Sequence, residues 1–266
     1  MAFQPSSLQD ALLPVFFVSG GFSLVELMVV LGIISILALL AVPELQSLQK
    51  SGNFSRQVYD MVDSINFARS YALGENTYVY LGLTEVDRTQ NPGASPQKPG
   101  PGRVALAAVA AKDGTRGVSL TSNSWINYAN GGNLLLIRPV QEFDFLYLAP
   151  ELPDPASGGM ARPSTSNGVQ LIKDGATVFP SPPFASTPFS IPLGSAVGSG
   201  KYNFNSAIPF NPQGQIILNG SAVQWLEIDL QPYVGAVPPS TPSANQGNQA
   251  AIVVDGATGA ISIYRP

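Results

Sequence analysis

A single carboxylate lies inside a long apolar run near the start of this sequence. Between Phe22 and Val42, Glu26 is the only charged residue. As an α-helix this run would be roughly 32 Å long, which is enough to cross the hydrocarbon core of a bilayer. A carboxylate in such surroundings is costly, so Glu26 is a candidate functional residue. The alternative is an ordinary signal anchor that carries one glutamate.

The order of residues around Glu26 resembles the signal of type IV pilins and pseudopilins. Gly21 and Phe22 precede it, and Pro43 follows the apolar run. By this resemblance a prepilin peptidase cuts between Gly21 and Phe22, and the new N-terminal Phe22 is methylated on its amine. The resemblance also implies that Glu26 contacts the N-terminal amine of a neighbouring subunit. Pro43 then corresponds to the proline that kinks pilin helices.

The same resemblance divides the chain into a leader (1–21), a transmembrane and assembly helix (22–43) and an exported domain (44–266). It implies an inner-membrane, single-pass protein whose C-terminal domain is periplasmic or extracellular. The leader departs from the family, because its only charge is Asp10 and all 13 basic residues follow from Lys50 onward. The positive-inside rule alone would keep the domain in the cytoplasm. The motif is the more specific signal and is followed here, and a misassigned start codon would explain the conflict.

Composition excludes several kinds of chemistry. The chain has no cysteine and no histidine, which removes the usual zinc sites, disulfides, and Ser/His or Cys/His nucleophile pairs. A net charge of −4 argues against a nucleic-acid surface. We therefore expect no enzyme activity, no cofactor, no metal and no nucleic-acid partner.

Two other groups of acidic residues have to be weighed. Glu227 and Asp229 alternate with apolar residues along an expected strand, as paired catalytic carboxylates would. A charged, solvent-exposed strand face explains them better. Asp255 precedes Gly256-Ala257-Thr258-Gly259, a pattern that suits either a calcium site or a hairpin turn. The turn is the preferred interpretation.

The remaining pattern predicts an α+β, pilin-like fold: one long N-terminal helix, membrane-spanning in its first half, packed on an antiparallel sheet with long Pro/Gly-rich loops. The helix should continue over about 44–73, burying a face that contains Val58, Met61, Val62 and Ile65, and stop at Gly74. The sheet should occupy about 77–266. Strands are expected near 77–83, 103–111, 133–140, 214–218, 224–230, 251–254 and 260–264, with further candidates at 143–148 and in a hairpin of 169–172 and 176–179.

Local features of this region carry narrower resemblances. Ala68 to Ala72, followed by a strand, is similar to the helix-to-sheet junction of GspH/FimT-type minor pseudopilins, and so are the turn at 210–214 and the last hairpin. The final residues weakly resemble Verrucomicrobial prepilin-like cassette proteins. Arg69 is expected to contact exposed carbonyls at its own helix end. Pro/Gly-rich loops are expected at 91–102, 149–167, 180–200 and 231–249.

Two functions fit these observations. The first is a minor pilin or pseudopilin, a structural subunit of a type IV pilus or type II secretion-like filament. Its partners would be the prepilin peptidase, other pilin or pseudopilin subunits and the inner membrane. The second is a membrane-anchored adhesin or binding module at a filament tip or in the periplasm, with the loops as its contact surface.

Overall fold

The computed structural model describes residues 23–116, 133–149, 152–153, 159–163, 169–172, 189–195, 199–204, 206–218, 221–233 and 248–265. For residues 38–51, 169–172 and 218 it describes the backbone alone. Contacts divide the chain into two units, Met1–Gln49 and Lys50–Pro266.

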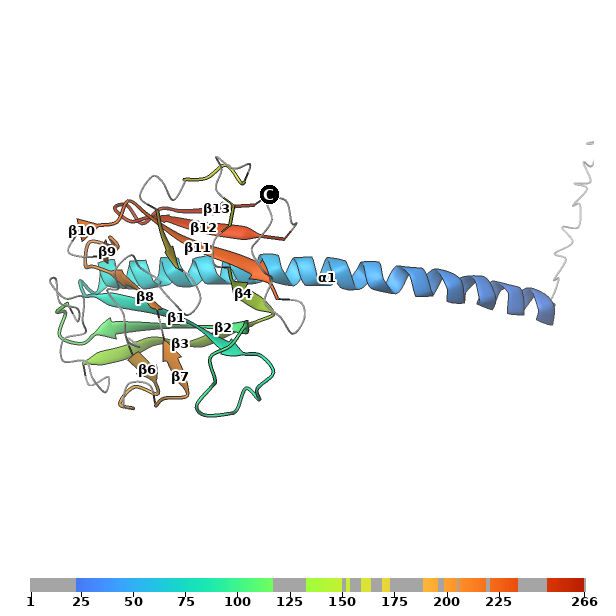
Figure 1. Ribbon diagram of the computed structural model, residues 1–266, viewed down its shortest axis with the longest axis horizontal. Coiled ribbons are helices and arrows are strands. Elements are labelled where there is room, and N and C mark those ends of the chain that lie inside the picture. Colours follow the sequence, from blue (N-terminus) through green and yellow to red (C-terminus); the bar gives the residue numbers. More distant parts are fainter. Residues whose placement is uncertain are drawn as a thin grey trace, which may run out of the picture. The chain divides into compact units, whose positions relative to one another are not determined.

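One long helix precedes a series of strands in the described part of the chain (Figure 1). The helix, α1, is Leu24–Gly74. The strands are β1 (Val79–Asp87), β2 (Gly102–Ala111), β3 (Leu134–Asp144), β4 (Leu146–Leu148), β5 (Val169–Ile172), β6 (Phe189–Ile191), β7 (Tyr202–Phe204), β8 (Ser206–Phe210), β9 (Ile217–Leu218), β10 (Ser221–Ala222), β11 (Trp225–Pro232), β12 (Ala250–Asp255) and β13 (Ile261–Tyr264).

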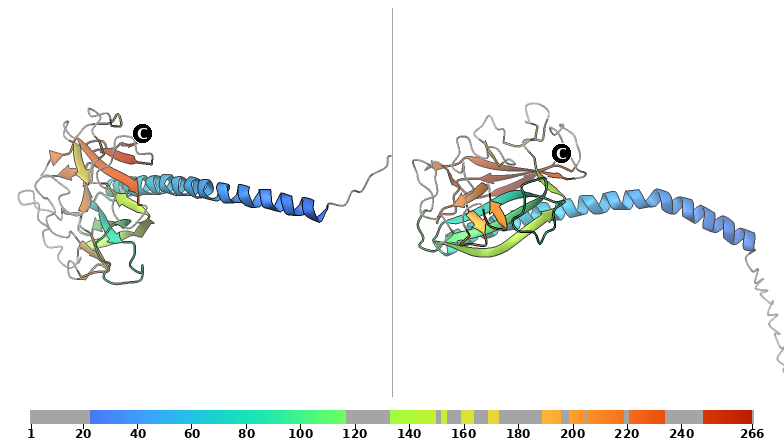
Figure 2. Two further views of the ribbon diagram at one scale, coloured as in Figure 1. Left: turned by 45° about the vertical axis from the view of Figure 1, so that its right-hand side comes forward. Right: turned by 60° about the horizontal axis from the view of Figure 1, so that its bottom comes forward.

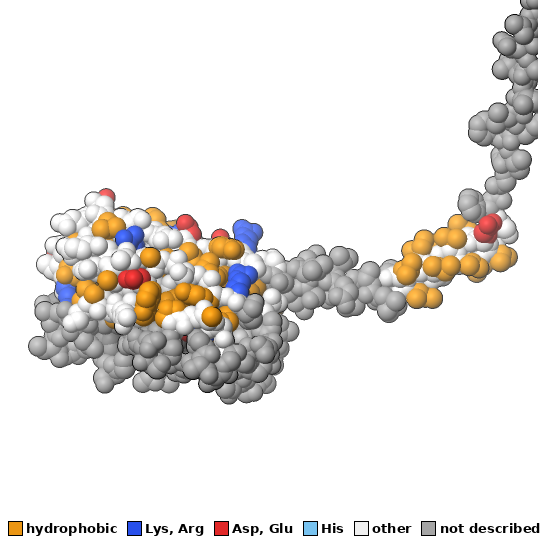
Figure 3. Space-filling view, turned by 90° about the horizontal axis from the view of Figure 1, so that it is seen from above, with side chains coloured by type: hydrophobic (Ala, Val, Ile, Leu, Met, Phe, Trp, Pro, Cys, Tyr) orange, Lys and Arg blue, Asp and Glu red, His pale blue; other side chains and the backbone are white. Residues whose placement is uncertain are grey.

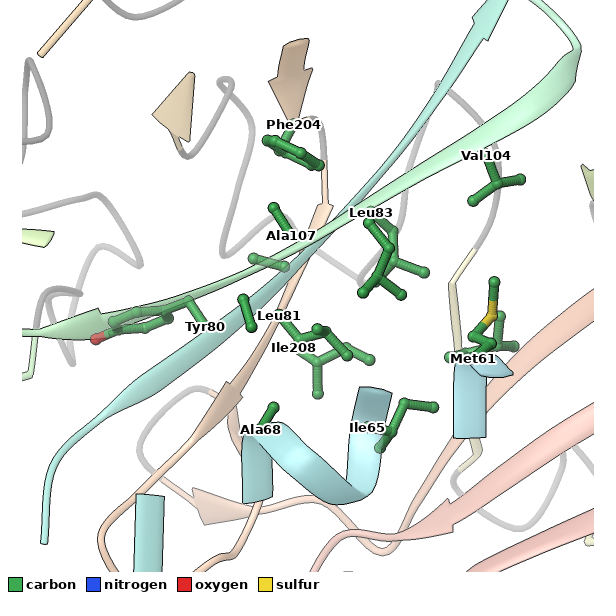
Figure 4. Close-up of a cluster of buried hydrophobic side chains, with 14 of the residues drawn as sticks. Met61, Ile65, Ala68, Tyr80, Leu81, Leu83, Val104, Ala107, Phe204 and Ile208 are labelled. Atoms are coloured by element: carbon green, nitrogen blue, oxygen red, sulfur yellow. The ribbon is translucent and has the colours of Figure 1, made fainter. Parts of the chain in front are cut away.

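The C-terminal half of α1 packs on a sheet through the face that the sequence predicts. Val58, Met61 and Ile65 are completely buried, and Val62 is partly buried against the same core. Figure 4 shows Met61, Ile65 and Ala68 of α1 directed toward side chains of β1 and β8. Spacing of three and four residues places these side chains on one side of the helix, and the sheet removes them from water. The helix ends at Gly74, the expected position, but the left-handed residue that follows the helix is Asn76, with a φ of +51°, and not Gly74.

The sheet under α1, here called the β1 sheet, has the strand order β3-β2-β1-β8 and is antiparallel throughout. Leu81 and Leu83 of β1 are buried on the side facing α1 (Figure 4). β8 forms one edge, where Pro209 pairs with Tyr80. An edge position suits Pro209 because proline has no N–H to donate to a second neighbour.

The opposite face of the β1 sheet is covered by the β6–β7 hairpin. Phe189 and Phe204 pack against each other, with ring centroids 4.9 Å apart, over Gly82 of β1. A Cβ at position 82 would lie 2.6 Å from Cζ of Phe189. Figure 4 shows Phe204 and Ala107 on the side of the sheet away from Ile65. Gly82 is therefore the position that lets the aromatic pair approach the backbone.

A second sheet, the β11 sheet, has the order β13-β12-β11-β4, and β5 also pairs with β11. In the left view of Figure 2, β12 and β13 (red) lie on the opposite side of the C-terminal half of α1 from β2 and β3 (green), whereas β4 contacts β2. Glu85 of β1 links the sheets, because its Oε1 accepts a hydrogen bond from the backbone N–H of Leu148 in β4. Leu226, Ile228 and Leu230 of β11 belong to the same core cluster as the buried face of α1. The described fold is thus α+β, with a helix packed on antiparallel sheets.

The structure departs from the expected strands in several places. β1 was expected to start at residue 77 but starts at Val79, because the polar groups of Thr77 bond outside the strand. The N–H of Thr77 donates to Ala72 O at the helix end, and its hydroxyl donates to Ala111 O. β6 lies inside the stretch 180–200 that was expected to be irregular, and β8 was not expected at all. β5 was expected in a hairpin, yet its described partner is β11, in parallel. The remainder of that hairpin, 173–179, lies outside the described residues.

Candidate functional site

The described chain enters α1 directly after the expected cleavage site. Leu27 N–H donates to Ser23 O, closing the first helical turn, and Glu26 lies in that turn. A carboxylate in the first turn of a helix interacts favourably with the unpaired N–H groups there. Gly21 and Phe22 lie outside the described residues, so the cleavage and methylation sites stay predictions.

The side chains that follow are apolar and exposed on all sides of α1. From Leu24 to Leu37 the exposed fractions of the large apolar side chains run from 42% at Val30 to 74% at Leu24. Figure 3 shows hydrophobic side chains over this part of α1. An exposed helix that is apolar on every side requires an apolar partner or a lipid environment. The hydroxyl of Ser35 donates to Leu31 O at 2.7 Å, so this polar group is satisfied within the helix itself.

Two expectations about this segment are left open. Within the described residues, no helix has the length and apolar character needed to cross a membrane. α1 includes position 43 without interruption, but its side chains from 38 to 51 are not described. The kink at Pro43 and the contact made by Glu26 therefore stay predictions.

The carboxylates of β11 lie in surroundings opposite to those expected. Glu227 and Asp229 are both fully buried, so the prediction that they form a solvent-exposed strand face was wrong. The residues described between Ala149 and Pro163 pack over this face of the β11 sheet, where Leu152 and Met160 form a small apolar cluster with Ala251. From the sequence, this segment was expected to be a loop, and nothing in its Pro, Ser and Gly residues indicated that it would cover a sheet.

Arg162 is the cation that accompanies the buried pair. Its Nε donates to Glu227 Oε1 at 2.8 Å, and its other two nitrogens donate to Pro153 O and Leu152 O at 2.8 and 3.0 Å. Asp229 Oδ2 accepts the N–H of Leu152 at 2.9 Å. Sequence reasoning missed Arg162; the available signal was an isolated basic residue within the Pro/Ser/Gly stretch 149–167.

Burial and the neighbouring Glu227 raise the pKa of Asp229 well above its ordinary value. Desolvation is the largest cause, the charge of the neighbouring Glu227 adds to it, and the N–H of Leu152 and the charge of Arg162 oppose it. Perturbed carboxyl pairs of this kind also occur in catalytic sites. Here both side chains are inaccessible, so neither can touch a substrate while the covering residues stay in place.

The residues that suggested a calcium site form a turn. Asp255 Oδ1 accepts the backbone N–H groups of Ala257 and Thr258 at 2.9 and 2.8 Å. Gly259 has a φ of +70°, a left-handed conformation that glycine adopts without penalty. These contacts account for the residue types without a bound ion.

Arg69 was expected to contact the carbonyls at its own helix end, and this prediction was wrong. Its Nε donates instead to Gly214 O, 3.3 Å away in the turn between β8 and β9. The same side chain lies against Gly259 in the β12–β13 turn. Arg69 therefore joins α1 to two turns that are distant from it in sequence.

Comparison with known proteins identifies the N-terminal segment. Residues 18–42 match the family model for the prokaryotic N-terminal methylation motif. This motif is the signature of type IV pilins and pseudopilins, and it confirms the expectation drawn from Gly21, Phe22 and Glu26. The chain thus carries the signal of a prepilin-like protein, and proteins with this motif are structural rather than enzymatic. No curated protein and no solved structure matches the chain.

Proposed function

We propose that the chain is a minor pilin or pseudopilin, a structural subunit of a type IV pilus or a type II secretion-like filament. The observation that carries this proposal is the methylation motif at residues 18–42. It coincides with a helix start that displays one carboxylate among exposed apolar side chains. Both features suit a subunit that joins others through its N-terminal helix.

Processing comes first in this proposal. A prepilin peptidase removes residues 1–21 by cutting the Gly21–Phe22 bond, and the amine of Phe22 is then methylated. The apolar part of α1 holds the protein in the inner membrane, and the domain that begins near residue 44 is periplasmic or extracellular. Pro43 kinks the helix where this domain begins.

Glu26 serves assembly. Its partner is the ammonium group of Phe22 on another copy or on a related subunit, which supplies the cation that a carboxylate among apolar helices needs. Breaking a buried pair by removing one partner costs roughly 3–5 kcal/mol, because the other charge is left unpaired. Incorporation into a filament should therefore depend on this carboxylate.

The experiment compares two variants in cells that contain the peptidase. Glu26→Gln keeps the size of the side chain and removes its charge, so cleavage should continue while incorporation into filaments or complexes falls. Gly21→Ala should stop at the earlier step and leave an uncleaved precursor. Fractionation followed by immunoblotting measures both outcomes. Normal incorporation of Glu26→Gln would rule out the assembly role of this residue.

A binding module displayed at a filament tip is the second candidate, and one observation favours it. The Pro/Gly-rich loop after β1 is held in shape by the buried Gln97, whose Nε2 donates to the carbonyls of Asn91, Pro92 and Ala94. A preformed loop loses little conformational freedom on binding. Gln97→Ala should then weaken adhesion to a target surface without changing assembly, whereas unchanged adhesion would count against this candidate.

A further inference from the structure

Within the part of the chain that the structure describes, two oxygens of the buried carboxyl pair on β11 have no hydrogen-bond donor. They are Oε2 of Glu227 and Oδ1 of Asp229. The other oxygen of each group is satisfied, Glu227 Oε1 by Arg162 and Asp229 Oδ2 by the N–H of Leu152. A buried acceptor without a donor is unfavourable, and two of them on neighbouring side chains of one strand face require an explanation.

The charges around the pair do not balance if both groups are ionised. Among the described residues, Arg162 is the only cation that contacts them, and its side chain is 2% exposed. Three titratable side chains lie on the same face of neighbouring strands: Tyr147 of β4, Tyr264 of β13 and Asp255 of β12. The carboxylate of Asp255 accepts a hydrogen bond within its own turn. Residues directly opposite the pair on β12 are Val253 and Ala251, which are apolar. Two buried carboxylates would thus face one guanidinium.

We propose that Glu227 and Asp229 share one proton in the folded protein, so that the pair carries a single negative charge matched by Arg162. The proton is bound to Oδ1 of Asp229 and is donated to Oε2 of Glu227. One O–H group therefore supplies both missing contacts and leaves the cluster electrically neutral. The two residues are two positions apart on β11, so their side chains lie on the same face of the strand, as this arrangement requires.

This shared proton makes the attachment of Leu152, Pro153 and Arg162 to β11 sensitive to pH. Loss of the proton would place two negative charges beside one positive charge, in a site that water does not reach. The two carboxylates would then repel each other. The site to which Arg162 and Leu152 bind would carry a net negative charge. The β11 sheet is expected to hold its covering segment most firmly at acidic pH.

The direction of the pH effect follows from the two states. Asp229 is protonated in the folded chain at a pH where an unfolded aspartate, with a pKa of about 3.9, is already ionised. The folded state then binds more protons, so the ratio of folded to unfolded protein falls as pH rises above about 4. One proton gives up to a tenfold fall per pH unit, continuing until Asp229 ionises in the folded state.

Infrared difference spectroscopy of the full-length protein in detergent, titrated from pH 4 to 9, tests the proposal directly. At pH 7 the wild type should show the C=O band of one protonated carboxyl group. Asp229→Asn should lose this band, while Asp60→Asn should keep it. Asp60 is a suitable control because it forms an exposed pair with Arg56 on α1. Absence of the band from wild-type protein at pH 7 would overturn the proposal, whatever the variants do.

Urea unfolding of the same proteins provides a second measurement. The midpoint of the wild type should fall between pH 4 and 7, and the midpoint of Asp229→Asn should fall less. The difference between the two pH dependences should correspond to the binding of one proton. Asp60→Asn should show the same pH dependence as the wild type. Equal pH dependence of wild type and Asp229→Asn would contradict the shared proton. Should Asp229→Asn fail to fold, the wild-type infrared titration still decides.

Discussion

Gly259, in the turn between β12 and β13, lies directly against the side chain of Arg69 on α1. A Cβ at position 259 would overlap Nε and Cδ of Arg69. Arg69 also donates to Gly214 O, in the turn between β8 and β9. One helix side chain therefore contacts two turns, one that follows a strand of the β1 sheet and one within the β11 sheet. Arg69 thus gives these two turns a common structural role.

Gly259→Ala should therefore destabilise the protein for two reasons. The backbone at this position is left-handed, which costs an L-residue about 1–2 kcal/mol, and the new methyl group displaces Arg69. Gly114→Ala is a matched control, because Gly114 has a φ of +68° but its Cβ would meet nothing closer than 3.9 Å. Chemical denaturation should show a larger loss for Gly259→Ala. Equal losses would mean that Arg69 moves aside without cost.

Gly82→Ala should disturb the aromatic cover of the β1 sheet. Its methyl group would lie 2.6 Å from Phe189 and 2.9 Å from Phe204. Overpacking a buried site costs about 1–3 kcal/mol, measured as a lower free energy of unfolding. Phe189→Leu in the same chain should recover part of this loss by making room. No recovery would indicate that the cost arises elsewhere.

Ile65→Ala tests the packing of α1 on the β1 sheet. Ile65 is completely buried, and removing a buried branched side chain costs about 2–5 kcal/mol. Leu73→Ala on the same helix is the control; Leu73 is 43% exposed, and we expect a loss below about 1 kcal/mol. Urea midpoints give both values, and similar losses for the two variants would contradict the packing described for this face.

Local periodicity predicts the helix well, because the apolar face at Val58, Met61 and Ile65 repeats at helical spacing. β8 was missed since it is short and contains Pro209, and its pairing with β1 joins residues far apart in the chain. Glu227 and Asp229 were misplaced for a related reason. Alternation identifies two faces of a strand, but whether the charged face meets water depends on which other segment folds over it.

The N-terminal site shows the same division between local and distant information. The signal at Gly21, Phe22 and Glu26 is a contiguous motif, so it can be recognised from sequence alone. Arg162 and its contacts with Glu227 could not be recognised from sequence, because the partners are separated by 65 residues.

The central claim is that this chain is processed as a prepilin, and intact-mass spectrometry of protein from cells containing the peptidase tests it most directly. The account predicts a mature chain that begins at Phe22, lacks residues 1–21 and carries one additional methyl group. Gly21→Ala expressed in the same cells should yield only the uncleaved chain. Recovery of the wild type solely at its full-length mass, with active peptidase present, would contradict the account.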